Sequence, residues 1–450
     1  MLLSKIETIY KRRLTSKRVL AIIFVALFFV LFRPVVSLID PVGYYAWPRS
    51  VLIDGDLDVS NEFDHYGMDE GLPDTATGYQ HNQWSAGSGI FWLPAMGVAH
   101  GIALAGERIG LSIAADGYSW PYALAASLTS AVTAFGAVLL IFNISRRYFS
   151  DFAALISTLA VWLATPLVFY QYHQPLMSHA HDIFLNALFV WLWLDARKNR
   201  HRPLTMLLLG LVIGAAMWVR IQNGVLLVVL ALEISYDFLN QIRQSEKRFD
   251  LRPIINRTGS LAVGFALAFV PQVLFWRRVF GSWVLNSYEN SGGGEFEWFA
   301  HMLEVLISSN RGLFVWAPVT FVCLLGLRQL FKADQRLTLV LGGVTFLQWV
   351  VIGSWSAWSG GDAFGPRFWI ALFPFFGLSL AALLNRFDTA SDRSRFVVAS
   401  ILIVFVGWNF LLMFQYSLGL VAPAGPVDLG EMVWNQFTLI PNLVGQIWGG

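Results

Sequence analysis

Apolar stretches long enough to cross a lipid bilayer recur along almost the whole chain, and they constrain its fold more than any other feature. A bilayer core of roughly 30 Å requires a helix of about 17 to 25 apolar residues. Lipid cannot hydrogen-bond free backbone groups, so each span must be helical. The pattern predicts an all-α polytopic membrane protein with about 11 transmembrane helices, near residues 19–39, 120–142, 151–170, 181–196, 204–220, 222–239, 259–276, 312–331, 337–354, 367–385 and 396–416.

The composition excludes a soluble protein of this size. Hydrophobic residues make up 56% of the 450 residues and charged residues 13%, and the mean hydropathy is +0.57. The net charge of +2 gives no support for a nucleic-acid partner. Cys323 is the only cysteine, so the chain cannot form an intramolecular disulfide.

The positions of the basic residues predict how the spans are oriented. The first apolar run follows a basic segment, is longer than the apolar core of a signal peptide and has no small-residue cleavage site after it, so we expect a retained helix with a cytoplasmic N-terminus. The stretch Gly89–Ala105 is ambiguous. If it spans, Arg146 and Arg147 face outward. If it lies along or re-enters the outer face, every basic loop faces the cytoplasm, which the positive-inside rule favours. We adopt this second interpretation, with basic loops at 146–147, 197–202, 243–257, 332–336 and 386–395.

The outer face then holds almost every unusual polar residue, in segments 40–120, 170–180, 277–311 and 355–367. The cytoplasmic loops are short and basic and contain no P-loop or glycine-rich phosphate cradle. Chemistry driven by a cytosolic nucleotide is therefore disfavoured.

The first outer loop, residues 40–119, is strongly acidic at its start. Arg49 is the only basic residue there among nine carboxylates, namely Asp40, Asp54, Asp56, Asp58, Glu62, Asp64, Asp69, Glu70 and Asp74. Asp40 directly follows the first span, at the water boundary, where partial desolvation could tune it as a general base. An ordinary solubilising charge at a helix end is the alternative, and both interpretations stay open.

Two outer segments have residue types that can bind metals. The run Asp54–Glu62 is dense in oxygen ligands, but it lacks the glycine and the closing glutamate of an EF-hand loop, which favours solvated turn carboxylates. The segment Tyr170–His181 contains three histidines. A metal site is possible there, but a hydrogen bond from His179 to a phosphate or sugar fits the other residues better. We expect neither a metal nor another cofactor.

Arginines at the outer ends of spans indicate an anionic ligand. Arg220 ends an apolar segment, and Arg311 and Arg367 lie beside glycines. A guanidinium group can hold a phosphate bidentately. The alternative is an arginine that only reaches toward lipid headgroups.

Several short motifs occur in a specific order between about Asp40 and Phe368: the Asp-x-x-x-Tyr-Tyr segment Asp40–Tyr45, the acidic run Asp54–Glu62, Gly87–Pro94, Pro175–His179, Arg311–Phe314 and Phe364–Arg367. Together they resemble the GT-C superfamily of polytopic glycosyltransferases, close to the protein O-mannosyltransferase and lipid A aminoarabinose transferase branch. The resemblance implies inverting transfer of a sugar from a polyprenyl-phosphate carrier to a glycan, lipid or protein acceptor at the outer face of the plasma membrane.

The resemblance also implies roles for single residues. Asp40 would be the catalytic base, helped by a second acid, Asp58 or Glu62, because Pro41 stands where the family usually has a second acid. The donor phosphate would be held by Arg311, Arg367, His179 and Arg220. We expect substrate contacts from Tyr44, Tyr45, Arg49 and Asn61.

The chain is expected to form one GT-C-like transmembrane domain over residues 1–450, with interfacial helices in the first outer loop and a short outer tail at 417–450. A transporter or flippase of a lipid-linked sugar is the rival interpretation, but we find no internal repeat and few intramembrane charges. A polymerase or ligase of lipid-linked oligosaccharide is the nearest enzyme alternative.

Overall fold

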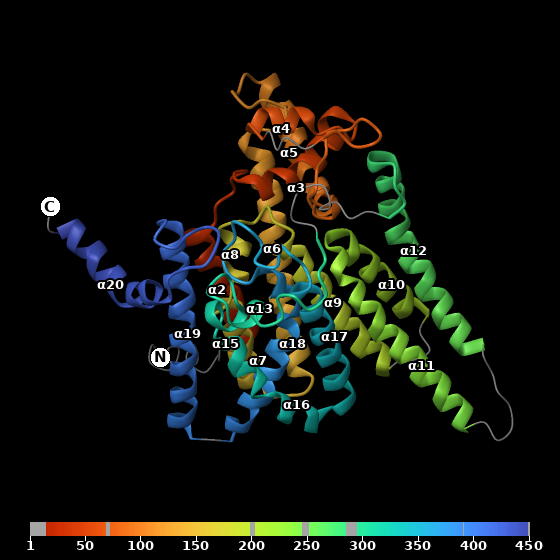
Figure 1. Ribbon diagram of the computed structural model, residues 1–450, viewed down its shortest axis with the longest axis vertical. Coiled ribbons are helices and arrows are strands. Elements are labelled where there is room, and N and C mark those ends of the chain that lie inside the picture. The colour runs from red at the N-terminus through yellow and green to blue at the C-terminus, as the bar shows by residue number, and fades with distance from the viewer. Residues whose placement is uncertain are drawn as a thin grey trace, which may run out of the picture.

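The computed structural model describes residues 15–68, 73–198, 203–244, 252–284, 295–389 and 391–448. Within these ranges every regular element is a helix (Figure 1), and one isolated β-bridge joins Phe296 to Trp355. The all-α fold predicted from the sequence is therefore confirmed. Asp69 and Glu70 of the acidic loop, and the basic residues of segments 1–14, 199–202 and 245–251, lie outside the described residues.

The first span is shorter than the sequence predicted. Helix α2 (Ser16–Leu31) ends before Pro34, and residues 32–36 are not helical. Proline lacks the amide proton that a helix needs and pushes the preceding residue out of the helical region. The chain re-enters a helix at α3 (Ile39–Arg49), which is followed by the π-helical turn η1 (Ser50–Asp54) and by α4 (Ser60–Tyr66).

The helix α5 (Gly87–Arg108) corresponds to the ambiguous stretch of the sequence. It is apolar and long enough to cross a membrane, but its contacts lie along the first half of α6 (Trp120–Arg146). Trp92 donates to Ser130 at 2.8 Å, and the His100 ring meets the Tyr122 hydroxyl at 2.7 Å. α5 thus packs against α3 and α6, and Figure 1 shows α3, α4 and α5 at the same end of the bundle. That this end lies at the outer face stays a prediction.

Two predicted spans are each broken near a proline. Residues 151–170 form α7 (Asp151–Leu163) and α8 (Leu167–Tyr172), which are separated at Pro166. Residues 312–331 form α14 (Leu313–Trp316), α15 (Val319–Leu324) and α16 (Leu327–Ala333), with Pro318 at the first break. The prediction of one continuous helix at 312–331 was wrong, because proline removes an intrahelical hydrogen bond.

The remaining helices complete the bundle. They are α9 (His179–Lys198), α10 (Pro203–Val219), η2 (Ile221–Val225), α11 (Leu226–Gln244), α12 (Arg252–Phe280), α13 (Glu304–Ile307), α17 (Gln335–Gly353), η3 (Arg367–Leu372), α18 (Phe373–Leu384), η4 (Asn385–Phe387), α19 (Asp392–Ser417) and α20 (Leu429–Trp448). The predicted tail thus contains a helix, which leaves the body of the molecule in Figure 1.

Glycines allow α10 and α12 to pack closely. A Cβ atom built on Gly210 would lie 2.1 Å from the carbonyl oxygen of Leu261, and one on Gly264 would lie 2.0 Å from that of Leu207. Small residues of this kind are what lets helix backbones approach in a membrane, where apolar burial does not drive association. The α10–α12 pair forms one wall of the cavity described below.

The basic loops meet at the end of the bundle opposite α3. Arg197 at the end of α9 pairs with Asp334 at 3.0 Å, and the Tyr148 hydroxyl donates to the same carboxylate at 3.2 Å. The amide of Ser150 donates to Asn385 at 2.9 Å. Six helices among the described residues are long and apolar enough to cross a membrane, so the count of about 11 stays a prediction.

Candidate active site

The helix α3 divides the predicted site residues between two faces. Asp40 and Tyr44 are four residues apart and therefore share one face of a helix with 3.6 residues per turn. Tyr45 and Arg49 are also four apart, but they point to nearly the opposite face. The sequence therefore builds two separate clusters, an Asp40 cluster and an Arg49 cluster.

Asp40 lies in the first turn of α3 and pairs with Arg367, which is 327 residues away in the sequence. Trp84 donates its indole N–H to the other carboxylate oxygen at 2.9 Å. The Asp40 side chain keeps 24% of its surface exposed, whereas Arg367 keeps 11%. Asp40 is thus held in place by two donors and stays accessible to a ligand.

A glycine admits the Arg367 side chain. Gly360 has a φ of +83°, and a Cβ atom at this position would lie 2.7 Å from Nε of Arg367. The guanidinium donates to the Gly360 carbonyl at 2.6 Å, while its Nε has no hydrogen-bond partner among the described residues. The turn at Gly360 and Gly361 thus fixes Arg367, whose charge faces Asp40.

The second arginine of the Asp40 cluster is Arg220. It donates to the Ser178 hydroxyl at 3.2 Å, and Ser178 donates to the hydroxyl of Tyr44 at 3.2 Å. Its Nε lies 3.6 Å from the Asp182 carboxylate. Two asparagines donate to this carboxylate, Asn223 at 2.8 Å and Asn186 at 3.1 Å. A fully buried, fixed carboxylate therefore orients Arg220.

His179 lies between these groups at the start of α9. Its ring is fully buried, 4.5 Å from the ring of Tyr170 between centroids, and Arg220 and Arg367 are its charged neighbours. Neither ring nitrogen has a hydrogen-bond partner among the described residues. Buried polar atoms normally have one, so His179 retains bonding capacity for a ligand.

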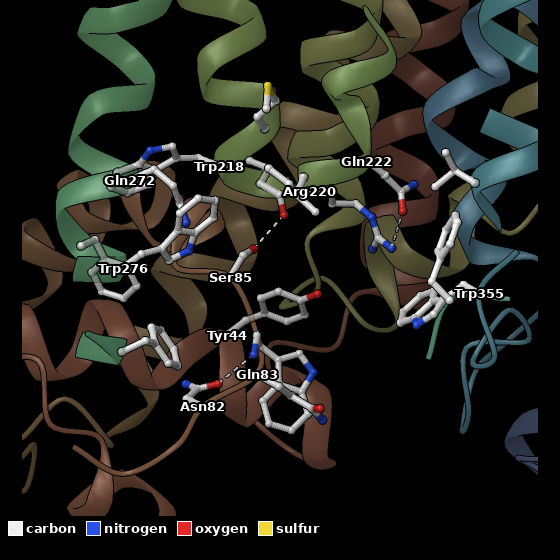
Figure 2. Close-up of a pocket in the computed structure, with 18 of the residues that line it drawn as sticks. Tyr44, Asn82, Gln83, Ser85, Trp218, Arg220, Gln222, Gln272, Trp276 and Trp355 are labelled. Atoms are coloured by element: carbon white, nitrogen blue, oxygen red, sulfur yellow. Dashed lines mark hydrogen bonds between the residues drawn. The ribbon is translucent and has the colours of Figure 1, made fainter. Parts of the chain in front are cut away.

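A cavity of about 350 Å³ opens beside the Asp40 cluster (Figure 2). Tyr44, Trp84 and Arg220 line it, together with residues from the end of α10, from α12 and from α17. Figure 2 shows the Tyr44 hydroxyl and the Arg220 side chain on the same side of this space. Its size lies at the lower end of the range of roughly 300–1,000 Å³ for small-molecule pockets.

The Arg49 cluster lies apart from Asp40. Arg49 lies nine positions after Asp40 along α3, which corresponds to about 13.5 Å of helix rise. Arg49 donates to Glu62 at 2.9 Å and also to Asp54, and it lies 4.2 Å from the Tyr118 ring. Burial raises the pKa of Glu62 to about 7 despite this hydrogen bond. Arg49 thus ties together η1, α4 and the segment before α6.

Two further predicted residues belong to the Arg49 cluster. Asn61 donates to Asp54 at 2.8 Å, and the Tyr45 hydroxyl donates to the carbonyl of Gly117 at 2.7 Å. Asp58 accepts a hydrogen bond from the Ser60 amide at 3.2 Å in its own turn. The structure does not bring Asp58, Glu62, Tyr45, Arg49 or Asn61 to Asp40.

Arg311 has its donors occupied by the backbone. It donates to the carbonyl oxygens of Ala363 at 2.9 Å, Gly425 at 2.7 Å and Ala422 at 2.7 Å, and also to Pro423. Its side chain is buried, and the residue has a φ of 65°. These bonds hold the loop after α19 in place. Arg311 therefore does not contribute a free cation to the Asp40 cluster.

Sequence reasoning missed Trp84 and Asp182. Asp182 could have been found, because an acid in the first turn of an apolar helix is costly in a membrane and marks a functional region. Trp84 gave no such signal, since an indole at the edge of a membrane protein is ordinarily an interfacial anchor.

The fold is similar to those of several solved membrane proteins. ArnT from Cupriavidus metallidurans in complex with undecaprenyl phosphate superposes with a TM-score of 0.52 and 17% identity, covering 95% of this chain and 70% of ArnT. Its apo form gives 0.50 and 16%, with coverages of 94% and 70%. An Archaeoglobus fulgidus oligosaccharyltransferase tethered to an acceptor peptide gives 0.50 and 12%, with coverages of 93% and 56%. The chain has a GT-C fold.

The fold resemblance predicted from the motifs is thereby confirmed, and the chain is a multi-pass membrane protein. No protein-family model matches the sequence, and no curated protein matches it. At 12–17% identity the likeness to these structures concerns the fold alone.

Proposed function

We propose that the protein is an inverting glycosyltransferase that moves a sugar from a polyprenyl-phosphate carrier to an acceptor hydroxyl or amide. The observation that carries this proposal is the partly exposed Asp40 against Arg367, at the edge of a cavity that also holds Arg220. The shared fold supports it, because ArnT was solved with undecaprenyl phosphate bound. A base and a phosphate-binding cation side by side are what such a transfer needs.

In the proposed reaction the acceptor oxygen or nitrogen attacks the anomeric carbon from the face opposite the phosphate. Asp40 takes the acceptor proton as the new glycosidic bond forms. The bond between the anomeric carbon and the phosphate oxygen breaks, and its electron pair leaves with the polyprenyl phosphate. The configuration at the anomeric carbon is inverted.

The arginines stabilise the leaving group in this proposal. Negative charge grows on the phosphate in the transition state, so a fixed cation nearby lowers the barrier. An incoming phosphate competes with Asp40 for Arg367, which would leave the Asp40 carboxylate able to accept a proton. Arg220 and the unpartnered His179 would complete the phosphate site.

Asp40 acts alone as the base in this proposal. Glu62 is bound to Arg49, and Asp58 is bound within its own turn. We assign neither of them a catalytic role.

The proposed reaction takes place at the outer face of the membrane. Basic loops meet at the end of the bundle opposite Asp40. Under the positive-inside rule this end and the N-terminus are cytoplasmic. The Asp40 end then faces the periplasm or the cell exterior.

The replacement Asp40→Asn tests the base directly. We expect turnover to fall by about 10² to 10⁴-fold, the usual contribution of general base catalysis. The assay uses the full chain in proteoliposomes with a panel of polyprenyl-phosphate sugars and cell-envelope extract as acceptor, and it measures released polyprenyl phosphate. Asp64→Asn, at an exposed carboxylate of the same loop, serves as the matched control.

Retention of more than about a tenth of wild-type turnover in Asp40→Asn would refute the base role. Movement of the donor across the bilayer with no release of polyprenyl phosphate by the wild-type protein is the result that a flippase gives. That result would refute the enzymatic proposal as a whole.

A further inference from the structure

We infer that the cavity beside Asp40 selects a donor whose sugar is a neutral hexose, without an amino or a carboxyl group. This inference rests on the proposed function and names its substrate class. The cavity lies next to the Asp40 cluster, because Trp84 lines it and also donates to Asp40 at 2.9 Å.

The cavity lining offers neutral hydrogen-bonding atoms that no described protein group uses. The indole nitrogen of Trp218, Nε2 of Gln222 and Oε1 of Gln272 are buried and have no hydrogen-bond partner among the described residues. Buried polar atoms are normally paired, and an amide side chain can turn toward a ligand. A sugar hydroxyl both donates and accepts, so it can satisfy each of these atoms.

The lining contains no carboxylate among the described residues. An ammonium group on the sugar would lose water without gaining a counter-charge from the described lining residues, which is costly. The nearest acid to the cavity's arginine is Asp182, which is fully buried and already receives donors from Asn186 and Asn223. An amino sugar is therefore disfavoured.

The only charged side chain in the described lining is Arg220. In the proposed function this arginine binds the donor phosphate. A uronic acid would bring a second negative charge to the same cation, and like charges at close range repel each other. An acidic sugar is therefore disfavoured too.

Aromatic side chains make up much of the remaining lining, as Figure 2 shows for Trp218, Trp276 and Trp355, and aliphatic side chains such as Val219 and Ile352 complete it. Aromatic walls with a few placed polar groups are typical of small-molecule sites. Such walls suit the C–H faces of a hexose ring, while the amides at Gln222 and Gln272 suit its hydroxyls.

The test uses the wild-type full chain in proteoliposomes and three donors on the same polyprenyl phosphate: a neutral hexose, an aminopentose with a free amine, and a hexuronic acid. Release of polyprenyl phosphate in the presence of cell-envelope extract gives kcat/KM for each donor. We expect the hexose to be preferred by about tenfold or more, the discrimination that one pocket contact commonly provides.

Equal or faster turnover of the amino or acidic donor would overturn the inference and leave the proposed function intact. Turnover of none of the donors would overturn the proposed function and the inference with it. The two failures are therefore distinguishable in one experiment.

A variant with a negative charge in the cavity gives a second test of the sugar preference. Gln272→Glu should shift the ratio of kcat/KM for aminopentose over hexose upward by about tenfold, because it supplies the missing counter-charge. Gln335→Glu, at an exposed position at the start of α17, is the matched control. An unchanged ratio in a Gln272→Glu protein that melts like the wild type would contradict the assigned cavity.

Discussion

Arg367 has two acceptors in the structure, the Asp40 carboxylate and the Gly360 carbonyl. Its Nε has no hydrogen-bond partner among the residues that the structure describes. A phosphate that entered here could therefore replace Asp40 without leaving the guanidinium unpaired. This exchange makes Arg367 the residue whose replacement most clearly separates donor binding from catalysis.

We expect Arg367→Lys to raise the donor KM by about tenfold, because lysine keeps the charge but loses the planar fork, and a charge-assisted hydrogen bond contributes roughly 1.5–3 kcal/mol. Arg367→Ala should also lower kcat by about 10²-fold, since leaving-group charge grows in the transition state. Steady-state kinetics against donor concentration measure both parameters. Normal kinetics in Arg367→Ala would assign the phosphate to other residues.

Arg311→Ala is the control for this experiment. Arg311 donates to backbone carbonyls of the loop after α19, so its loss should lower the melting temperature and leave the donor KM unchanged. The two arginines look alike in the sequence, each beside a glycine. The sequence does not reveal which backbone carbonyls fold against a guanidinium, so it could predict Arg367 but not the different role of Arg311.

At the scale of elements, the Arg49 cluster joins α3 to α4. Burial lifts the pKa of Glu62 from 4.5 to about 7, and its Oε2 has no hydrogen-bond partner within the described part of the chain. Between these pH values the unfolded segment releases a proton that the folded segment keeps. The stabilisation is therefore fully present below about pH 4.5 and is lost as the pH rises through about 7.

We therefore expect α4 to become less protected from hydrogen exchange, after correction for the intrinsic rate, as the pH rises from 5 to about 8. Other titratable groups lie nearby, including Asp54, Asp116 and Tyr118. Glu62→Gln is the control, because it removes only the Glu62 titration. The same pH dependence in both proteins would show that Glu62 does not cause it.

The limits of the helices could be predicted only in part. An apolar window finds residues 335–353 and 392–417 well, because nothing interrupts them. It misses the breaks near Pro166 and Pro318, although a proline in the sequence predicts a helix break. The four-residue spacing of Asp40 and Tyr44 predicts that they share one face of α3. It does not predict the partners on each face, because these partners come from distant segments.

At the scale of the whole molecule, the orientation in the membrane decides which compartment supplies the substrates. We expect a cysteine at Asp64 in a Cys323→Ser background to react with an impermeant maleimide in intact cells with a permeabilised outer envelope. A cysteine at Arg393, an exposed position at the other end of the bundle, should react only after the inner membrane is opened. The opposite pattern would overturn the orientation and the choice of a lipid-linked donor.

An all-helical membrane fold could be predicted from composition and span length, since these reflect what a bilayer demands of any chain. The likeness to the GT-C fold came from the order of the motifs. Of the residues proposed for the donor site, Asp40 pairs with Arg367, and His179 has Arg367 and Arg220 as charged neighbours, while Tyr44 and Arg220 line the cavity. The resemblance offered Asp58 or Glu62 of the acidic run as a second acid, and charge density alone does not distinguish a substrate site from an ion-pair cluster such as the one around Arg49.

A density map of the full chain in lipid nanodiscs with polyprenyl phosphate bound would test directly whether the donor phosphate binds beside Asp40. We expect the phosphate within hydrogen-bonding distance of Arg367 or Arg220, next to Asp40 and at the edge of the cavity. Phosphate density at another site, for example at Arg277 and Arg278 near the end of α12, with the Asp40–Arg367 pair still closed, would contradict it.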